Sequence, residues 1–418
     1  MTILYILLVL LIVTRIFGEI AVRLRQPALV GELVGGIMLG LVVTQFSRTF
    51  PVLAGIPENE VFKAISDLAI FFIMLLGGLE MRPRDLARAS SRGIPIALGG
   101  IAVPLGLGYA AGFFFIPENP ARVAQCLLIG VALAITAVPV TVKVLMDLGQ
   151  LDSTVGRLIV TAALFDDILS LILLAVLTTL ATSGSVPPPL ELLWLLAKVM
   201  VFFASAYFVG RIILPRLGRN LKELELDYIE ISGLLAWALA LAVISEAIGM
   251  HFVVGAYLAG LVFTRNTVDS KTYEQTMQHV EGMTTGFFAP VFFASIGMHL
   301  DLTAILNIPG MLAVILLIAF CGKLLGAGGA ARATGMSNRD SIAVGFGMNA
   351  RGAVELIVAD IALRAGLFSQ PEPTPAVVRY LYSLIVIVAV VTTVVSPIVL
   401  RRFLSQNKPS RKVANTST

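Results

Sequence analysis

Charged residues are scarce in this sequence, and so are cysteine and histidine. Charged side chains make up 13% of its 418 residues, whereas an ordinary soluble domain carries about 25%. This scarcity excludes a soluble globular domain, because too few polar side chains are present to solvate its surface. Two cysteines and three histidines are too few and too scattered for a disulfide framework or a structural zinc site. We therefore expect neither a cofactor nor an enzymatic activity.

Long apolar runs fill the chain instead. Hydrophobic residues make up 57% of it, and a helix of about 20 apolar residues spans the roughly 30 Å hydrocarbon core of a bilayer. We count about thirteen such runs, which predicts an all-α polytopic membrane protein. Their approximate extents are 3–22, 28–45, 61–79, 93–115, 122–146, 156–182, 189–214, 226–248, 250–264, 277–298, 304–328, 340–364 and 377–400.

Basic residues are concentrated in every second predicted loop. They include Arg82, Arg84, Arg88, Arg216, Arg219, Lys222, Arg265, Lys271, Arg332 and Arg339. By the positive-inside rule, this bias predicts a multi-pass protein of the cell (inner or plasma) membrane with its N-terminus outside and its C-terminus in the cytoplasm. The same bias accounts for the net charge of +4, so membrane lipid is an expected partner and nucleic acid is not.

The predicted spans divide into two equal sets around the run at 189–214. This arrangement is typical of inverted-repeat transporters, in which discontinuous helices of the two halves cross near the membrane midplane. Two irregular segments, 135–141 and 345–352, interrupt corresponding spans. Pro139 removes a backbone donor in the first, and closely spaced glycines loosen the second. A simple proline kink is the alternative for Pro139. We predict an inverted-repeat fold with two crossing discontinuous helices.

Asp166 and Asp167 lie near the centre of the apolar run at 156–182. A carboxylate at bilayer depth costs at least about 2.5 to 3.5 kcal/mol on insertion scales, so such a pair indicates a functional site. A bound cation, replaced by a proton when it leaves, would compensate the charge. The pair therefore suggests a cation/proton exchanger. Lys323 lies in another apolar run and needs a carboxylate partner for the same reason.

Several motifs, taken together and in order, resemble the cation:proton antiporter-2 family. They are Leu76–Glu80, Thr136–Gly149, Leu164–Ile168, Gly255–Gly260, Phe292–Met298 and Arg351–Glu355. With its aspartate pair and intramembrane lysine, the chain is similar to the NapA-type sodium/proton antiporters. That resemblance implies an NhaA-like antiporter fold, a homodimer and elevator-type alternating access in one membrane unit, 1–402. Its dimer-domain helices would lie at roughly 1–80 and 226–298, and its core helices at roughly 93–182 and 304–400. A linker helix at 189–214 and a short cytoplasmic tail at 403–418 would complete the chain.

The resemblance also assigns roles at the site. It pairs Asp166 with Lys323 and leaves Asp167 as the ligand of the monovalent cation and the proton carrier. Adjacent helical residues differ by about 100° in direction, so the two carboxylates cannot both face one partner. A static bridge that only holds helices together is the alternative for Asp166 and Lys323, since buried ion pairs are often structural.

Other polar residues have weaker assignments. Thr136 and Thr141 could donate oxygens to the ion, but buried threonines commonly bond carbonyls of their own helix. Asn349 lies at the predicted break and could stabilise it. Arg351 and Glu355 are four residues apart and predict a structural ion pair. Asp67, Glu32 and Glu246 are carboxylates near the membrane without an assigned role.

The function expected from these residues is electrogenic exchange of protons for a monovalent cation. Na⁺ is the first candidate, and Li⁺ and K⁺ remain open because ligand geometry rather than residue type sets that choice. A K⁺/H⁺ antiporter of the potassium-efflux type and a sodium-coupled solute symporter of related fold are the alternatives. Adjacent aspartates on one helix cannot form the facing dyad of an aspartyl protease.

Overall fold

The computed structural model describes residues 2–46, 51–54, 59–81, 92–151, 153–183, 189–221, 228–264, 268 and 270–404. Within these ranges the chain is helical and contains no β-strand. Much of the basic loop sequence predicted above, including 82–91, 222–227 and 265–267, lies outside the described residues, as does the chain after residue 404.

Seven helical runs of the described chain are long and apolar enough to cross a membrane. They are α1 (Thr2–Arg23), α4 (Glu60–Glu80), α6 (Gly93–Phe115), α9 (Thr154–Ser183), α11 (Ile229–Ala247), the continuous run of α16 (Pro309–Lys323), η3 (Leu324–Gly328) and α17 (Gly329–Ala333), and α21 (Leu381–Leu404). Three shorter apolar helices in the same ranges are α2 (Ala28–Gln45), α7 (Arg122–Ala134) and α12 (Phe252–Val262). The predicted all-helical class is confirmed, whereas the count of thirteen spans stays a prediction.

The remaining helices are shorter, less apolar or both. They are α3 (Pro51–Ala54), α8 (Val138–Asp147), α10 (Pro189–Leu221), α13 (Ser270–Met283), η2 (Thr284–Phe288), α14 (Ala289–Met298), α15 (Ala304–Asn307), α18 (Asn338–Gly347), α19 (Ala353–Arg364) and α20 (Ala376–Arg379). The predicted runs at 122–146 and 340–364 are each divided, into α7 and α8 and into α18 and α19. Both divisions fall in the irregular segments singled out from the sequence.

Local sequence sets several helix starts. The side chain of Asn59 accepts a hydrogen bond from the amide of Phe62, 3.0 Å away, at the start of α4. Ser337 does the same for the amide of Asp340 at the start of α18, at 3.1 Å. Each cap satisfies an amide that the first helical turn leaves without a partner.

Small residues let α2 approach its neighbours closely. A Cβ at Gly36 would lie 2.5 Å from the carbonyl oxygen of Ala294 on α14, and one at Gly31 would overlap the backbone of Phe17 on α1. Gly31 and Gly36 therefore allow α2 to pack closely on other helices of the same chain, as small residues do in membrane bundles.

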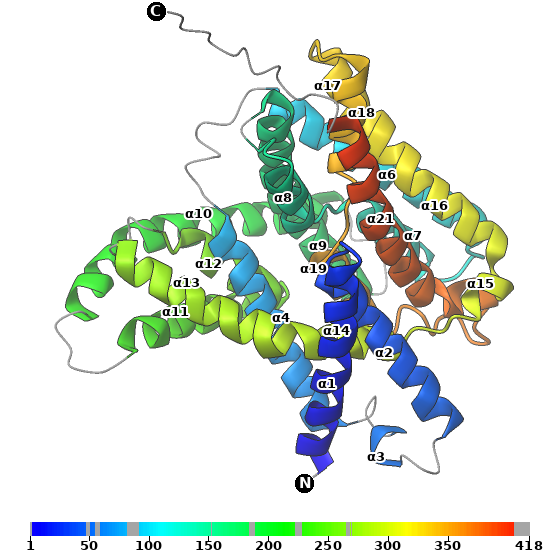
Figure 1. Cartoon of the computed structure of the whole chain (residues 1–418), viewed down its shortest axis with the longest axis horizontal. Helices are drawn as coiled ribbons and strands as arrows, with labels where there is room; N and C mark the ends of the chain where they lie inside the picture. Colours follow the sequence, from blue (N-terminus) through cyan, green and yellow to red (C-terminus); the bar gives the residue numbers. More distant parts are fainter. Residues whose placement is uncertain are drawn as a thin grey trace, which may run out of the picture.

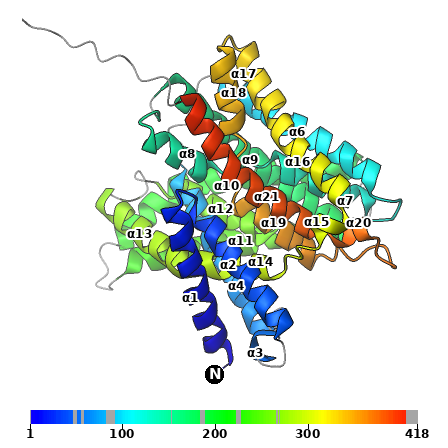
Figure 2. The same cartoon turned by 45° about the vertical axis from the view of Figure 1, so that its right-hand side comes forward.

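The helices pack in two groups with α10 between them (Figures 1 and 2). In one group α4 packs on α12 and α14, and α2 packs on α1 and α14. In the other, α6 packs on α7, α9, α16 and η3, while α21 packs on α18 and α19. α10 contacts α9, α11 and α12. α1 begins at the opposite end of the molecule from the end of α21 (Figure 1).

Candidate functional site

The two helix breaks cross and bond to each other. The amide of Ala137, between α7 and α8, donates to the carbonyl of Ala350, between α18 and α19, at 2.7 Å. The approach is close enough to need a glycine, because a Cβ at Gly352 would lie 2.7 Å from the Cβ of Ala137. Residues from the two halves of the chain thus form the predicted crossing of discontinuous helices.

Threonines of the first break hold it to the second. The hydroxyl of Thr136 donates to the carbonyl of Met348 at 2.9 Å, and that of Thr141 donates to Gly347 at 2.6 Å. These bonds go to the opposite break rather than to carbonyls of their own helix. Both side chains are buried, so they shape the crossing, and a direct role as ion ligands stays a prediction.

Pro139 and Asn349 lie at the two breaks. Pro139 is the second residue of α8, in a first turn where its missing amide interrupts no helical bond. The chain therefore breaks before Pro139, at Ile135 to Ala137, rather than kinking at the proline. Asn349 is buried and its amide nitrogen donates to the hydroxyl of Ser396 on α21 at 3.2 Å, which ties the second break to that helix.

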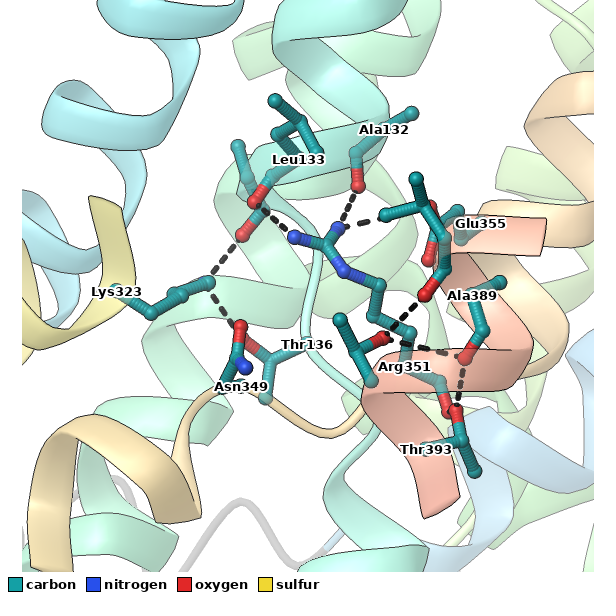
Figure 3. A network of polar contacts seen from close by, with 12 residues as sticks. Ala132, Leu133, Thr136, Lys323, Asn349, Arg351, Glu355, Ala389 and Thr393 are labelled. Carbon is teal, nitrogen blue, oxygen red and sulfur yellow. Dashed lines mark hydrogen bonds and ion pairs between the residues drawn. The ribbon is translucent and has the colours of Figure 1, made fainter. Parts of the chain in front are cut away.

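Two buried cations cap the carbonyl end of α7. The guanidinium of Arg351 donates to the carbonyls of Ala132 and Leu133, and the Leu133 contact is 2.9 Å long. The ammonium of Lys323 donates to the carbonyl of Ala134. The last carbonyls of a helix lack intrahelical partners and carry partial negative charge, so both cations lie where the helix end favours them (Figure 3).

Lys323 also contacts the first aspartate. Its Nζ lies 3.4 Å from Oδ1 of Asp166 and 2.7 Å from the hydroxyl of Thr136. The other oxygen of Asp166 accepts a hydrogen bond from the amide of Thr136 at 3.0 Å. Asp166 and Lys323 are both fully buried. The pairing that the resemblance implied is present, and it joins α9 to α16 through the break after α7.

Asp167 occupies a different environment. Its side chain is partly exposed, and in the described part of the chain no lysine or arginine forms an ion pair with it. Its charged neighbours include Asp166 and Glu80 at the end of α4, and the hydroxyl of Tyr257 on α12 is a hydrogen-bonding partner. An accessible carboxylate without a fixed counter-ion is what an exchanging ion or proton requires.

Arg351 and Glu355 form the predicted ion pair, with 3.5 Å between Nη1 and Oε1. Both are fully buried, and neither carboxylate oxygen of Glu355 has a hydrogen-bond partner among the described residues. The stronger contacts of Arg351 are those to α7. Sequence reasoning missed these contacts because they join residues more than 200 positions apart.

Tyr257 was also not assigned from the sequence, although it lies in one of the motifs that carry the resemblance. It is buried, and its hydroxyl lies 3.4 Å from the sulfur of Met81 as well as facing Asp167. Its ring lies beside Gly77 on α4. The only signal in the sequence was its position in that motif, which by itself gives no partner.

Comparisons with known proteins show the family of the chain. Residues 6–406 match the family described as "Sodium/hydrogen exchanger, transmembrane". The chain is 31% identical over 391 residues to the Na(+)/H(+)-K(+) antiporter GerN of Bacillus cereus, covering 94% of this chain and 93% of GerN. It is 27% identical over 401 residues to the Na(+)/H(+) antiporter of Enterococcus hirae, covering 95% and 97%.

The fold also resembles a solved antiporter. The structure of the sodium proton antiporter MjNhaP1 from Methanocaldococcus jannaschii at pH 8 matches with a TM-score of 0.70, over 97% of this chain and 98% of that one. At 18% identity this likeness shows the fold, which is that of a polytopic membrane antiporter. The expected resemblance is confirmed by the match over residues 6–406, and the chain belongs to the sodium/hydrogen exchanger family.

Proposed function

We propose that this protein exchanges protons for a monovalent cation across a membrane, with Asp167 as the shared carrier. The observation that supports this most directly is the contrast between the two aspartates. Asp166 is fully buried against Lys323, while Asp167 is partly exposed and has no ion pair in the described part of the chain. A carboxylate in that position can take a cation or a proton, but not both.

Na⁺ is the first candidate cation, because the relatives described above are named as sodium antiporters. K⁺ is the second, because the name of GerN includes it. Li⁺ is a third. The choice among them depends on the number and spacing of the oxygen ligands that would surround the ion at Asp167.

The proposal includes the manner of transport. The group containing α6 to α9 and α16 to α21 would move as a core against the group containing α1 to α4 and α11 to α14, which would form a homodimer. The N-terminus would face the outside and the C-terminus the cytoplasm, following the bias of basic loops. Exchange of two protons for one cation, with Lys323 as the second proton site, would make transport electrogenic.

Reconstitution tests this function. Purified protein is placed in liposomes under a pH gradient, Na⁺, Li⁺ or K⁺ is added outside, and internal pH is recorded with a trapped dye. We expect a cation-dependent change of internal pH that protein-free liposomes lack. A protein that moves no protons with any of the three cations contradicts the proposal, and a response to K⁺ alone would select the second candidate.

A further inference from the structure

One ion pair joins the two helix groups away from the ion site. Arg364 is the last residue of α19, and its Nη1 lies 2.5 Å from Oδ1 of Asp67 on α4. Its Nε lies 2.7 Å from Oδ2 of Asp360 on its own helix. Asp67 is in the first half of α4, so the contact lies towards the side of the bundle where α4 begins and α19 ends.

The three charged side chains, Asp67, Asp360 and Arg364, differ in exposure and in the helix that carries them. Asp360 and Arg364 are one turn apart on α19 and move together whatever that helix does. Asp360 is nearly buried, with 8% of its side chain exposed, whereas Asp67 is 44% and Arg364 35% exposed. If α19 separates from α4, Asp360 therefore keeps Arg364 neutralised, and Asp67 is hydrated. Opening the contact leaves no buried charge without a partner.

α4 and α19 have different packing partners. α4 packs on α12, α14 and η2, while α19 packs on α21, α7 and α9 and touches α4 at a few positions only. A second hydrogen bond also joins the two groups. The hydroxyl of Tyr382, at the start of α21, donates to the carbonyl of Ile296 on α14 at 3.2 Å. An ion pair that bridges two such groups must break if one group slides past the other.

We propose that Asp67 and Arg364 form a latch that favours the arrangement of the two groups seen in this structure and opens when the core moves. The inference rests on the proposed alternating-access function. Because both side chains are partly exposed, the latch biases an equilibrium and does not lock it. Partly exposed ion pairs contribute enough to shift such an equilibrium about two- to fivefold.

Distance measurements between the groups test the latch. Spin labels are placed on cysteines at two exposed positions, Val61 on α4 and Ala376 on α20. The background carries Cys126→Ala and Cys321→Ala, and pulsed EPR on reconstituted protein gives the ratio of the two distance populations. Arg364→Gln should shift this ratio about two- to fivefold away from the closed contact. Asp67→Asn should do the same from the other helix while leaving the pair of Arg364 and Asp360 in place. Adding Asp67→Asn to Arg364→Gln should change the ratio little further, since Arg364→Gln has already removed the contact between the groups.

A matched control uses an ion pair that lies within one helix. Nζ of Lys63 lies 2.8 Å from Oε1 of Glu60 on α4. Lys63→Gln should leave the distances between the spin labels unchanged. Distance distributions of Arg364→Gln and Asp67→Asn that superimpose on the parent would overturn the latch. This measurement is independent of exchange: a parent protein that exchanges no cations would contradict the proposed function, while the distances still decide the latch.

Discussion

Asp166 and Asp167 are adjacent on α9, yet one is fully buried against Lys323 and the other is partly exposed beside Tyr257. The difference follows from helix geometry, since neighbouring side chains differ by about 100° in direction. Asp166 points to the break after α7 and to α16, and Asp167 points towards α12 and the end of α4. One pair of residues thus supplies a fixed charge pair and an exchangeable carboxylate.

Competition between cation and proton is the first expected consequence. If both use Asp167, the cation concentration for half-maximal exchange should rise about tenfold for each unit of pH below the titration point of the site. The maximum rate should change little. Isotope-flux measurements over a pH series give both quantities, and a half-maximal concentration independent of pH would contradict a shared carboxylate.

The second prediction concerns the membrane potential. Moving one net charge is worth about 2.3 kcal/mol per 100 mV, so an inside-negative potential should accelerate proton entry in exchange for the cation. Lys323→Gln keeps amide donors for Ala134 and Thr136 but removes the charge, and it should weaken this dependence. Liposomes clamped with valinomycin and K⁺ gradients, assayed with Na⁺, provide the measurement. If the exchange rate of the parent protein does not depend on the membrane potential, Lys323 is a structural bridge to Asp166 and not a proton site.

Arg351 is predicted to stabilise the folded protein. Arg351→Ala removes the caps on Ala132 and Leu133 and leaves the buried Glu355 without its counter-ion. Breaking a buried pair in this way costs about 3 to 5 kcal/mol, so we expect a lower thermal midpoint in detergent and reduced expression. Arg332→Ala is the control, because Arg332 is exposed and donates to a local carbonyl, that of Met336. A fully stable but inactive Arg351→Ala protein would instead give this residue a role in transport.

Tyr257 is predicted to tune the ion site. Its hydroxyl can donate to Asp167, and such a bond stabilises the charged carboxylate. A single hydrogen bond is worth about 0.5 to 1.5 kcal/mol, so Tyr257→Phe should move the pH profile of exchange upward by as much as about one unit. Tyr273→Phe is the matched control, since that hydroxyl donates to the carbonyl of Leu79 at 2.9 Å. Unshifted profiles in both variants would remove Tyr257 from the site.

Much of this arrangement could be predicted from the sequence. The predicted runs at 3–22, 28–45, 61–79 and 93–115 agree with α1, α2, α4 and α6 to within one residue, because apolar length is a strong signal in a membrane protein. The two breaks were also found, since proline and clustered glycines mark them locally. The π-helical turn η2 within the run at 277–298 was not predicted, although Gly286 lies in it and Pro290 follows it.

Contacts between distant residues could not be predicted in the same way. Arg351 was paired with Glu355 from their spacing, but its shortest contacts go to α7, where the helix end is exposed only once the two breaks cross. Asp67 had no assigned role because its partner, Arg364, is 297 positions away. In each case the polar residue was visible in the sequence, and its partner depended on the tertiary arrangement.

The central claim is that Asp167 carries the transported ion and proton, and one substitution tests it most directly. Asp167→Asn keeps the shape of the side chain but removes both the ionic ligand and the titratable group. Asp340→Asn, at the start of α18 and away from the crossing, is the matched control. In liposomes under a pH gradient, we predict cation-dependent proton movement for the parent and Asp340→Asn proteins and none for Asp167→Asn, with equal amounts of folded protein. Exchange by Asp167→Asn at a rate comparable to the parent would contradict the account.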